Sequence, residues 1–154
     1  MLTIREMPAA PLSHSVQLLL AEARQEGFDW MTNLEAAWVE RPFVGPGEGL
    51  FLAWMGDRLV GVAAITEDHY LRDGQTGRLR FVYVSSTSRG RGVADALTTR
   101  CLARAGGRWE VIRLHTENPV AARLYAKYGF AELPDADAEA THAKRASLRA
   151  TNVC

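Results

Sequence analysis

A short segment rich in glycine and arginine follows an apolar run near the middle of the chain. Residues 82–94 read Val-Tyr-Val-Ser-Ser-Thr-Ser-Arg-Gly-Arg-Gly-Val-Ala, which predicts a strand, a turn and the start of a helix in direct succession. The first amide groups of a helix have no partner within it, and glycines let an anion approach the main chain closely. Arg89 and Arg91 add positive charge. The segment therefore predicts a site for a phosphate or another anion.

The pattern of this turn narrows the kind of phosphate ligand. It lacks the Gly-Lys-Ser/Thr ending of a nucleotide P-loop, and it lacks the third glycine of the dinucleotide-binding pattern G-x-G-x-x-G. Nucleoside triphosphates and nicotinamide dinucleotides are therefore disfavoured. A Gly-Arg-Gly turn can also serve only the steric needs of a strand-to-helix connection, so its assignment depends on a second motif.

That second motif lies further along the chain, after another apolar strand. Asn118 opens a predicted helix that ends in Tyr-x-x-x-Gly-Phe, and the preceding turn reads Arg-x-x-Gly-x-Ala from Arg89 to Ala94. The two motifs, in this order, resemble the GNAT superfamily of acyl-CoA-dependent N-acyltransferases over roughly residues 50–130. The matching positions of the second motif are Asn118, Ala121, Leu124, Tyr125, Gly129 and Phe130.

The resemblance implies a binding site for acetyl-CoA as co-substrate, and it implies no metal. The backbone amides of residues 89–95 would hold the pyrophosphate, and the main chain of residues 82–84 would pair with the pantetheine arm as an added strand. The side chain of Asn118 would hydrogen-bond the same arm. The residues implied in cofactor binding are Val82, Tyr83, Val84, Arg89, Gly90, Arg91, Gly92, Val93, Ala94, Asp95 and Asn118.

Acyl transfer to an amine needs a neutral amine, stabilisation of an oxyanion and a proton for the departing thiolate. The resemblance assigns carbonyl polarisation to a backbone amide near Val84 and protonation of the thiolate to Tyr125. Helix patterns alone allow a different interpretation of two of these residues. Tyr125 also fits a core aromatic of an amphipathic helix, and Asn118 also fits a simple helix cap.

The sequence does not identify the residue that would act as general base. Many relatives carry a glutamate on the strand before the glycine loop or on the next strand, and Arg80 and Arg113 stand at the corresponding positions here. An amine of low pKa, or proton loss to solvent, would make a dedicated base unnecessary. Residues at neighbouring strand ends that could act through a water are Glu67, Asp68, His69, His115 and Glu117.

The amine acceptor is expected beside the segment between the first strand and the hairpin, which usually forms the acceptor wall in this family. Aromatic candidates for that wall are Trp30, Trp38, Phe43 and Tyr70, although each also fits the core. Residues 1–71 hold four basic and ten acidic side chains, a net charge of −6. That balance favours a cationic amine by electrostatic steering.

The elements that must position these residues follow from apolar patterns and turn residues. The resemblance implies a mixed α/β, mainly antiparallel sheet of six to seven strands with helices on both faces, splayed between the strands at 79–84 and 111–116. Further strands are predicted at 3–5, 50–54 and 59–65, with weaker ones at 130–133 and 143–150. Helices are predicted before Gly27, from Thr32 to Glu40 with Thr32 and Glu35 as a capping box, from the glycine turn to about Ala105, and from Asn118 to Gly129.

Composition limits the remaining possibilities. The chain has 154 residues with 18 basic and 18 acidic side chains, which is typical of one globular domain over residues 1–154. The net charge of zero argues against nucleic-acid binding, and the local excess of +5 in residues 72–104, seven basic against two acidic, suits a small phosphorylated ligand. The apolar runs are too short to cross a membrane and the first residues are no secretory signal, so we expect a cytoplasmic protein. Cys101 and Cys154 fit no metal or disulfide pattern.

The leading hypothesis is an N-acetyltransferase that moves the acetyl group from acetyl-CoA to a primary amine of a small molecule, protein or peptide. The amine would attack directly in a ternary complex, so Cys101 is not needed as a nucleophile. The alternative is a coenzyme A-binding sensor or scaffold that has lost catalysis, and a third hypothesis is an enzyme for another phosphorylated ligand. A homodimer is possible because many relatives dimerise.

Overall fold

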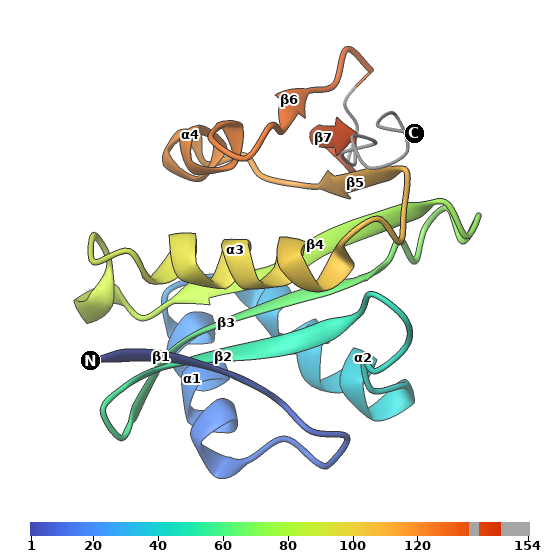
Figure 1. Cartoon of the computed structure of the whole chain (residues 1–154). Coiled ribbons are helices and arrows are strands. Elements are labelled where there is room, and N and C mark those ends of the chain that lie inside the picture. Colours follow the sequence, from blue (N-terminus) through green and yellow to red (C-terminus); the bar gives the residue numbers. More distant parts are fainter. Residues whose placement is uncertain (136–138, 146–154) are drawn as a thin grey trace.

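A computed structural model describes residues 1–135 and 139–145. Its centre is a seven-stranded sheet in the order β1-β2-β3-β4-β5-β7-β6 (Figure 1). Neighbouring strands are antiparallel except β4 and β5, which are parallel. The strands are β1 (Leu2–Glu6), β2 (Gly49–Met55), β3 (Arg58–Glu67), β4 (Thr76–Val84), β5 (Val111–Leu114), β6 (Ala131–Glu132) and β7 (His142–Arg145). The mixed, mainly antiparallel sheet expected from the sequence is confirmed.

Helices cover both faces of the sheet, as expected. The helical elements are α1 (His14–Gln25), η1 (Asp29–Thr32), α2 (Asn33–Glu40), η2 (Ser86–Ser88), α3 (Val93–Ala105) and α4 (Pro119–Ala126). Alternation along β2 shows how the two faces arise, because Leu50 and Leu52 pack in one core cluster while Phe51 and Ala53 pack in the other. The first cluster is covered by α1, η1 and α2, and the second by α3 and α4.

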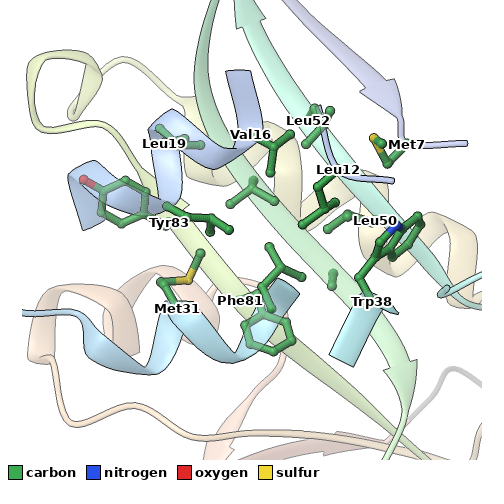
Figure 2. Packing of buried hydrophobic residues seen from close by; sticks show 14 of the residues in the cluster. Met7, Leu12, Val16, Leu19, Met31, Trp38, Leu50, Leu52, Phe81 and Tyr83 are labelled. Carbon is green, nitrogen blue, oxygen red and sulfur yellow. The ribbon is translucent and has the colours of Figure 1, made fainter. Parts of the chain in front are cut away.

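The cluster on the α1 and α2 face contains the largest aromatic side chains of the amino-terminal half. Trp38 and Phe43 are 2% and 3% exposed and meet edge to face at 5.2 Å. Figure 2 shows Met31 of η1 in the same cluster as the β4 side chains of Phe81 and Tyr83. This packing holds β4, the strand that borders the site, against α1, η1 and α2.

The sheet opens between β4 and β5. These strands pair only at residues 76–78 and 111–113, whereas β4 continues to pair with β3 up to Val84. In Figure 1 the two ribbons lie together at one end and diverge toward the end where α4 lies. The predicted splay between the strands at 79–84 and 111–116 is therefore confirmed.

Several local expectations need correction. Thr32 does not cap α2, because it closes the short η1 helix instead and its hydroxyl donates to the Asp29 carbonyl at 2.7 Å. The weak strand at 130–133 is the two-residue β6, and the strand expected at 143–150 is described as β7, His142–Arg145, while residues 146–150 lie outside the described part. Within the described ranges, no helix is long and apolar enough to cross a membrane.

Candidate active site

A cleft of about 1300 Å³ lies where β4 and β5 separate. The second half of β4, the glycine turn and the start of α3 form one part of its wall, and residues 114–118 and α4 form another. Every residue expected to bind the cofactor, except Arg91, lines this cleft, and so does Tyr125. The two sequence motifs therefore meet across a single cavity.

The glycine turn presents its backbone to the cleft. Gly90 and Gly92 have φ angles of +77° and +81°, a conformation that glycine adopts without strain. A side-chain carbon at either position would meet no atom within 4 Å, so the space beside the main chain is open. Gly92 precedes α3 without any side-chain cap, which leaves the first amides of the helix free for an anion. The turn fits the pyrophosphate of coenzyme A.

The Arg89 side chain does not reach across the glycine turn. Its Nε donates to the Val84 carbonyl at 3.0 Å, and its guanidinium donates to Glu26 at 2.7 Å. Glu26 also accepts from the hydroxyl of Tyr83, and Tyr83 is 3% exposed. The Tyr83 side chain therefore anchors β4 to α1, and Arg89 holds the turn against the same helix. Arg91 is exposed and lies outside the cleft wall.

Asp95 joins the two helices that border the cleft. Its carboxylate accepts from the Tyr128 hydroxyl at 2.9 Å and lies 2.9 Å from the Lys127 ammonium. The hydrogen bond from Lys127 holds the pKa of Asp95 below its usual range. The Tyr128 hydroxyl also contacts Thr99 on α3 at 3.1 Å. These contacts fix the separation of α3 and α4 and with it the width of the cleft.

Tyr125 and Asn118 lie on the α4 side of the cleft. Asn118 caps α4 through its side-chain oxygen, which accepts from the Val120 amide at 2.9 Å. Tyr125 is 6% exposed and packs against Phe130 with ring centres 5.9 Å apart. Burial raises the pKa of the Tyr125 hydroxyl, so the hydroxyl keeps its proton at neutral pH. Tyr125 therefore belongs both to the core cluster, through its ring, and to the lining of the cleft, and its hydroxyl is protonated.

A β-bulge changes the direction of β4 beside the cleft. The pairing with β3 shifts between Val62 and Ala64, and Phe81 has a φ angle of +58°. Such a φ is rare for a bulky residue and marks a local distortion held in place by its surroundings. Because of the extra residue, Arg80 lies opposite Ala64 and close to Phe81, its guanidinium carbon 4.3 Å from the ring centre. In a regular strand these two neighbours would face opposite sides.

The five candidate bases lie in very different surroundings. Asp68 is fully buried and paired with Arg113 and Arg78, and although burial opposes ionisation, the Arg113 hydrogen bond keeps its pKa low. Glu67 does not line the cleft. The other three, His69, His115 and Glu117, line it, and His115 lies 3.8 Å from Glu117. Burial lowers the pKa of His69 to about 4, which leaves it neutral and only weakly basic.

Two of the four aromatic residues predicted for the acceptor wall lie at the cleft, and two lie in the core. Trp30 and Tyr70 line the cleft, each 47% exposed. Trp38 and Phe43 belong to the buried core beneath β4 instead, because the apolar face of α2 turns toward the sheet. The cationic acceptor expected from the acidic side chains of residues 1–71 stays a prediction, because the lining of the cleft does not include those side chains.

Comparison with known proteins now identifies the family. The model of the acetyltransferase (GNAT) family matches residues 13–130. The chain belongs to the GNAT family. No curated protein matches the sequence, whereas many solved structures share the fold.

Three of these structures show how completely the GNAT fold is shared. A protein of Exiguobacterium sp. 255-15 assigned as an acetyltransferase is 24% identical, with a TM-score of 0.82 over 94% of this chain and 93% of that one. A GNAT-family acetyltransferase of Staphylococcus aureus Mu50 is 17% identical, with a TM-score of 0.71 over 96% and 100%. A protein of Clostridium acetobutylicum assigned as an acetyltransferase, crystallised with acetyl-CoA, is 19% identical, with a TM-score of 0.65 over 89% and 94%.

Two features of this GNAT chain were not assigned by the sequence motifs. One is the bulge at Phe81, which has no glycine to signal it. The other is the environment of Arg80, which lines the cleft on a strand that is otherwise mostly apolar. An arginine inside an apolar strand is the sequence signal that could have drawn attention to it.

Proposed function

We propose that this GNAT-family protein is an N-acetyltransferase that moves the acetyl group of acetyl-CoA to a primary amine. The observation that supports this most strongly is the single cleft that runs from the glycine turn past Tyr125 to Arg80. Val84 and Arg80 are four residues apart on β4, a separation of about 13 Å at the usual rise of a strand. An extended pantetheine arm can follow that strand segment and bring its thioester to the middle of the cleft.

The reaction would proceed by direct attack of the amine. The amine nitrogen forms a bond to the acetyl carbon, and the bond from that carbon to sulfur breaks. The thiolate takes a proton from Tyr125, whose buried hydroxyl is protonated at neutral pH. The attacking amine loses a proton toward the part of the cleft where His115 and Glu117 lie. Bulk solvent then reprotonates Tyr125.

A covalent acetyl-enzyme is not part of this proposal. Cys101 is fully buried within the core cluster beneath α3, and burial raises the pKa of its thiol. A buried thiol is a poor nucleophile because the thiolate is the reactive form. Cys101 also lies outside the lining of the cleft. The ternary complex therefore suits this chain better than a two-step exchange.

Binding and transfer can be tested separately. Thermal unfolding with coenzyme A or acetyl-CoA at 100 times Kd should raise Tm by about 5–10 °C for a domain of this size, and ATP should raise it less. A thiol-release assay with a panel of amines then measures transfer. Thermal stabilisation without transfer to any amine would favour the sensor or scaffold alternative, which is consistent with an arginine where many relatives carry a glutamate. No stabilisation by acetyl-CoA at millimolar concentration would refute both.

A further inference from the structure

Arg80 places an unpaired positive charge at the end of the cleft away from the glycine turn. The residue is partly buried and lines the cleft. Its guanidinium lies over the rings of Phe81 and Phe43, at 4.3 and 5.9 Å. Among the residues that the structure describes, no carboxylate lies within 4 Å of it. Burial and the neighbouring Arg78 lower the pKa of Arg80 to about 10, as expected where a cation is desolvated without a partner.

The two acids whose charges act on Arg80, Asp68 and Glu48, are each paired with other arginines. One of the Asp68 carboxylate oxygens accepts from Arg113 at 3.2 Å and from the Tyr70 and Leu71 amides at 2.9 and 3.0 Å. The other oxygen accepts from Arg113 at 2.9 Å and from Arg78 at 3.3 Å. Two arginines share this one carboxylate, so the group already carries a net charge of +1. Asp68 therefore cannot neutralise Arg80.

The two acids that line the cleft, Asp95 and Glu117, lie on other segments. Asp95 is on α3 beside the glycine turn, where Lys127 and Tyr128 bind it. The Glu117 side chain is 87% exposed, on the loop after β5, beside His115. Neither of these two acids forms an ion pair with Arg80.

His69 adds a second polar group without a partner at the same end of the cleft. Its ring lines the cleft and is neutral, since burial lowers its pKa to about 4. Its Nδ1 is buried and makes no hydrogen bond with any described residue. A neutral imidazole can donate one hydrogen bond. The cleft lining thus holds an arginine on β4 without an ion-pair partner and, in the loop after β3, an imidazole nitrogen without a hydrogen-bond partner among the described residues.

We propose that the acceptor amine is itself anionic, and that its carboxylate binds to Arg80 while its amino group faces the acetyl carbonyl. This inference rests on the proposed acetyl transfer and names its substrate class, amines of the amino-acid type. A guanidinium presents a planar fork that matches a carboxylate with two parallel hydrogen bonds. No described carboxylate forms an ion pair with Arg80, so an acceptor that carries its own carboxylate supplies the missing anion. The same charge disfavours polyamines and other cationic acceptors.

The test compares amino acids with the amines that they become on losing the carboxylate. Acetyl transfer to tyrosine, phenylalanine and lysine is measured beside transfer to tyramine, phenethylamine and cadaverine, with O-phosphoethanolamine as the phosphate-bearing amine. We expect kcat/KM to be higher for at least one amino acid than for its decarboxylated partner. In Arg80→Gln, kcat/KM for that amino acid should fall about 10- to 100-fold, as for loss of a charged hydrogen bond, while the value for the partner amine stays within about threefold.

Binding provides a readout that does not depend on turnover. Isothermal titration of protein saturated with coenzyme A measures the Kd of the amino acids, of their N-acetyl products and of the neutral amides N-acetyltyramine and N-acetylphenethylamine. Arg24→Gln removes one exposed charge on α1 outside the cleft and is the matched control for long-range steering. Arg80→Lys keeps the charge without the fork and should give an intermediate loss.

The outcomes separate the two proposals. If the enzyme acetylates tyramine or cadaverine as well as the amino acids, and Arg80→Gln changes neither kcat/KM nor Kd, then the anionic acceptor is wrong while acetyl transfer stands. Preference for O-phosphoethanolamine over every amino acid would overturn the carboxylate in favour of a phosphate. Carboxylate binding that depends on Arg80 without any turnover would support the acceptor site and refute the enzymatic proposal.

Discussion

Arg113 on β5 donates two hydrogen bonds to Asp68, at 2.9 and 3.2 Å, and so fastens the carboxyl-terminal strands to the loop after β3. Asp68 is fully buried, and Arg113 has a side chain only 14% exposed. The parallel pairing of β4 and β5 covers only residues 76–78 and 111–113. This ion pair therefore adds a side-chain connection to the short backbone pairing between the two parts of the splayed sheet.

Removal of the Asp68 carboxylate should destabilise the fold strongly. Asp68→Ala leaves two arginines in a buried position without their anion, and loss of one partner of a buried pair typically costs about 3–5 kcal/mol. The free energy of unfolding, measured by urea titration, should fall by that amount. Asp57→Ala in the exposed β2–β3 turn is the control and should change it by less than about 0.5 kcal/mol. An equal effect of the two substitutions would contradict the role of the pair.

Acid should weaken the protein through two buried carboxylates. Burial opposes ionisation of Asp68 and Glu48, yet hydrogen bonds from Arg113 and Arg41 hold both pKa values below the usual 3.8 and 4.5. Because the folded pKa is the lower one, the stabilisation is complete above the unfolded pKa and is lost as the pH falls from there through the folded pKa. We expect the free energy of unfolding to be nearly constant from about pH 5.5 to 7 and to fall below about pH 5. In Asp68→Asn the fall should be shallower, and an unchanged slope would exclude Asp68 as a cause.

Tyr125→Phe tests the proton donor. The ring and its contact with Phe130 remain, so coenzyme A affinity should change little. Loss of a general acid typically lowers turnover by about 100-fold or more, and this should appear in kcat rather than KM. Tyr128→Phe is the control for loss of a structural hydroxyl, because Tyr128 does not line the cleft and its hydroxyl only connects the end of α4 to Asp95 and Thr99 of α3. Equal turnover in wild type and Tyr125→Phe would remove Tyr125 from this role.

Gly92→Val tests the phosphate-binding turn. Valine at a φ of +81° is strained, and its branched side chain would occupy the open space beside the amides. Coenzyme A binding, measured by titration calorimetry, should be lost. Gly74→Val is a matched control, since Gly74 has a φ of +73° and equally open space but lies outside the cleft. If both variants bound coenzyme A normally, the pyrophosphate would have to lie elsewhere.

Local sequence signals predicted much of the framework. The Asn-Pro start of α4 and the glycine turn before α3 depend on interactions within a few residues, so the sequence alone predicted both. The strands predicted at 50–54 and 59–65 followed from apolar runs bounded by turn residues, and they correspond to β2 and β3. The predicted Thr32 cap was wrong because Thr32 is the last residue of η1 and its hydroxyl donates to Asp29.

Other features depend on contacts between distant residues, which a single sequence does not specify. Arg89 binds Glu26, 63 positions away, rather than facing a phosphate. The bulge at Phe81 has no local signal, because glycine is the usual mark of a positive φ. The net negative charge of residues 1–71 predicted a cationic acceptor. The effect of a charge on a ligand depends on its distance from that ligand, and the acidic side chains of residues 1–71 do not line the cleft.

Arg80→Met should make the protein more stable while impairing its activity toward anionic amines. Arg80 is partly buried without an anionic partner among the described residues, and a desolvated charge of this kind costs free energy in the folded state. Methionine keeps most of the side-chain packing against Phe81 and Phe43 but loses both cation–π contacts, which are worth about 0.5–1 kcal/mol where exposed. We expect a net gain of about 1 kcal/mol, which raises Tm by about 2–4 °C. A purely structural arginine would give the opposite result, a lower Tm with unchanged selectivity between amino acids and their decarboxylated amines. Differential scanning calorimetry of Arg80→Met beside Arg24→Met, on protein without ligand, distinguishes the two cases.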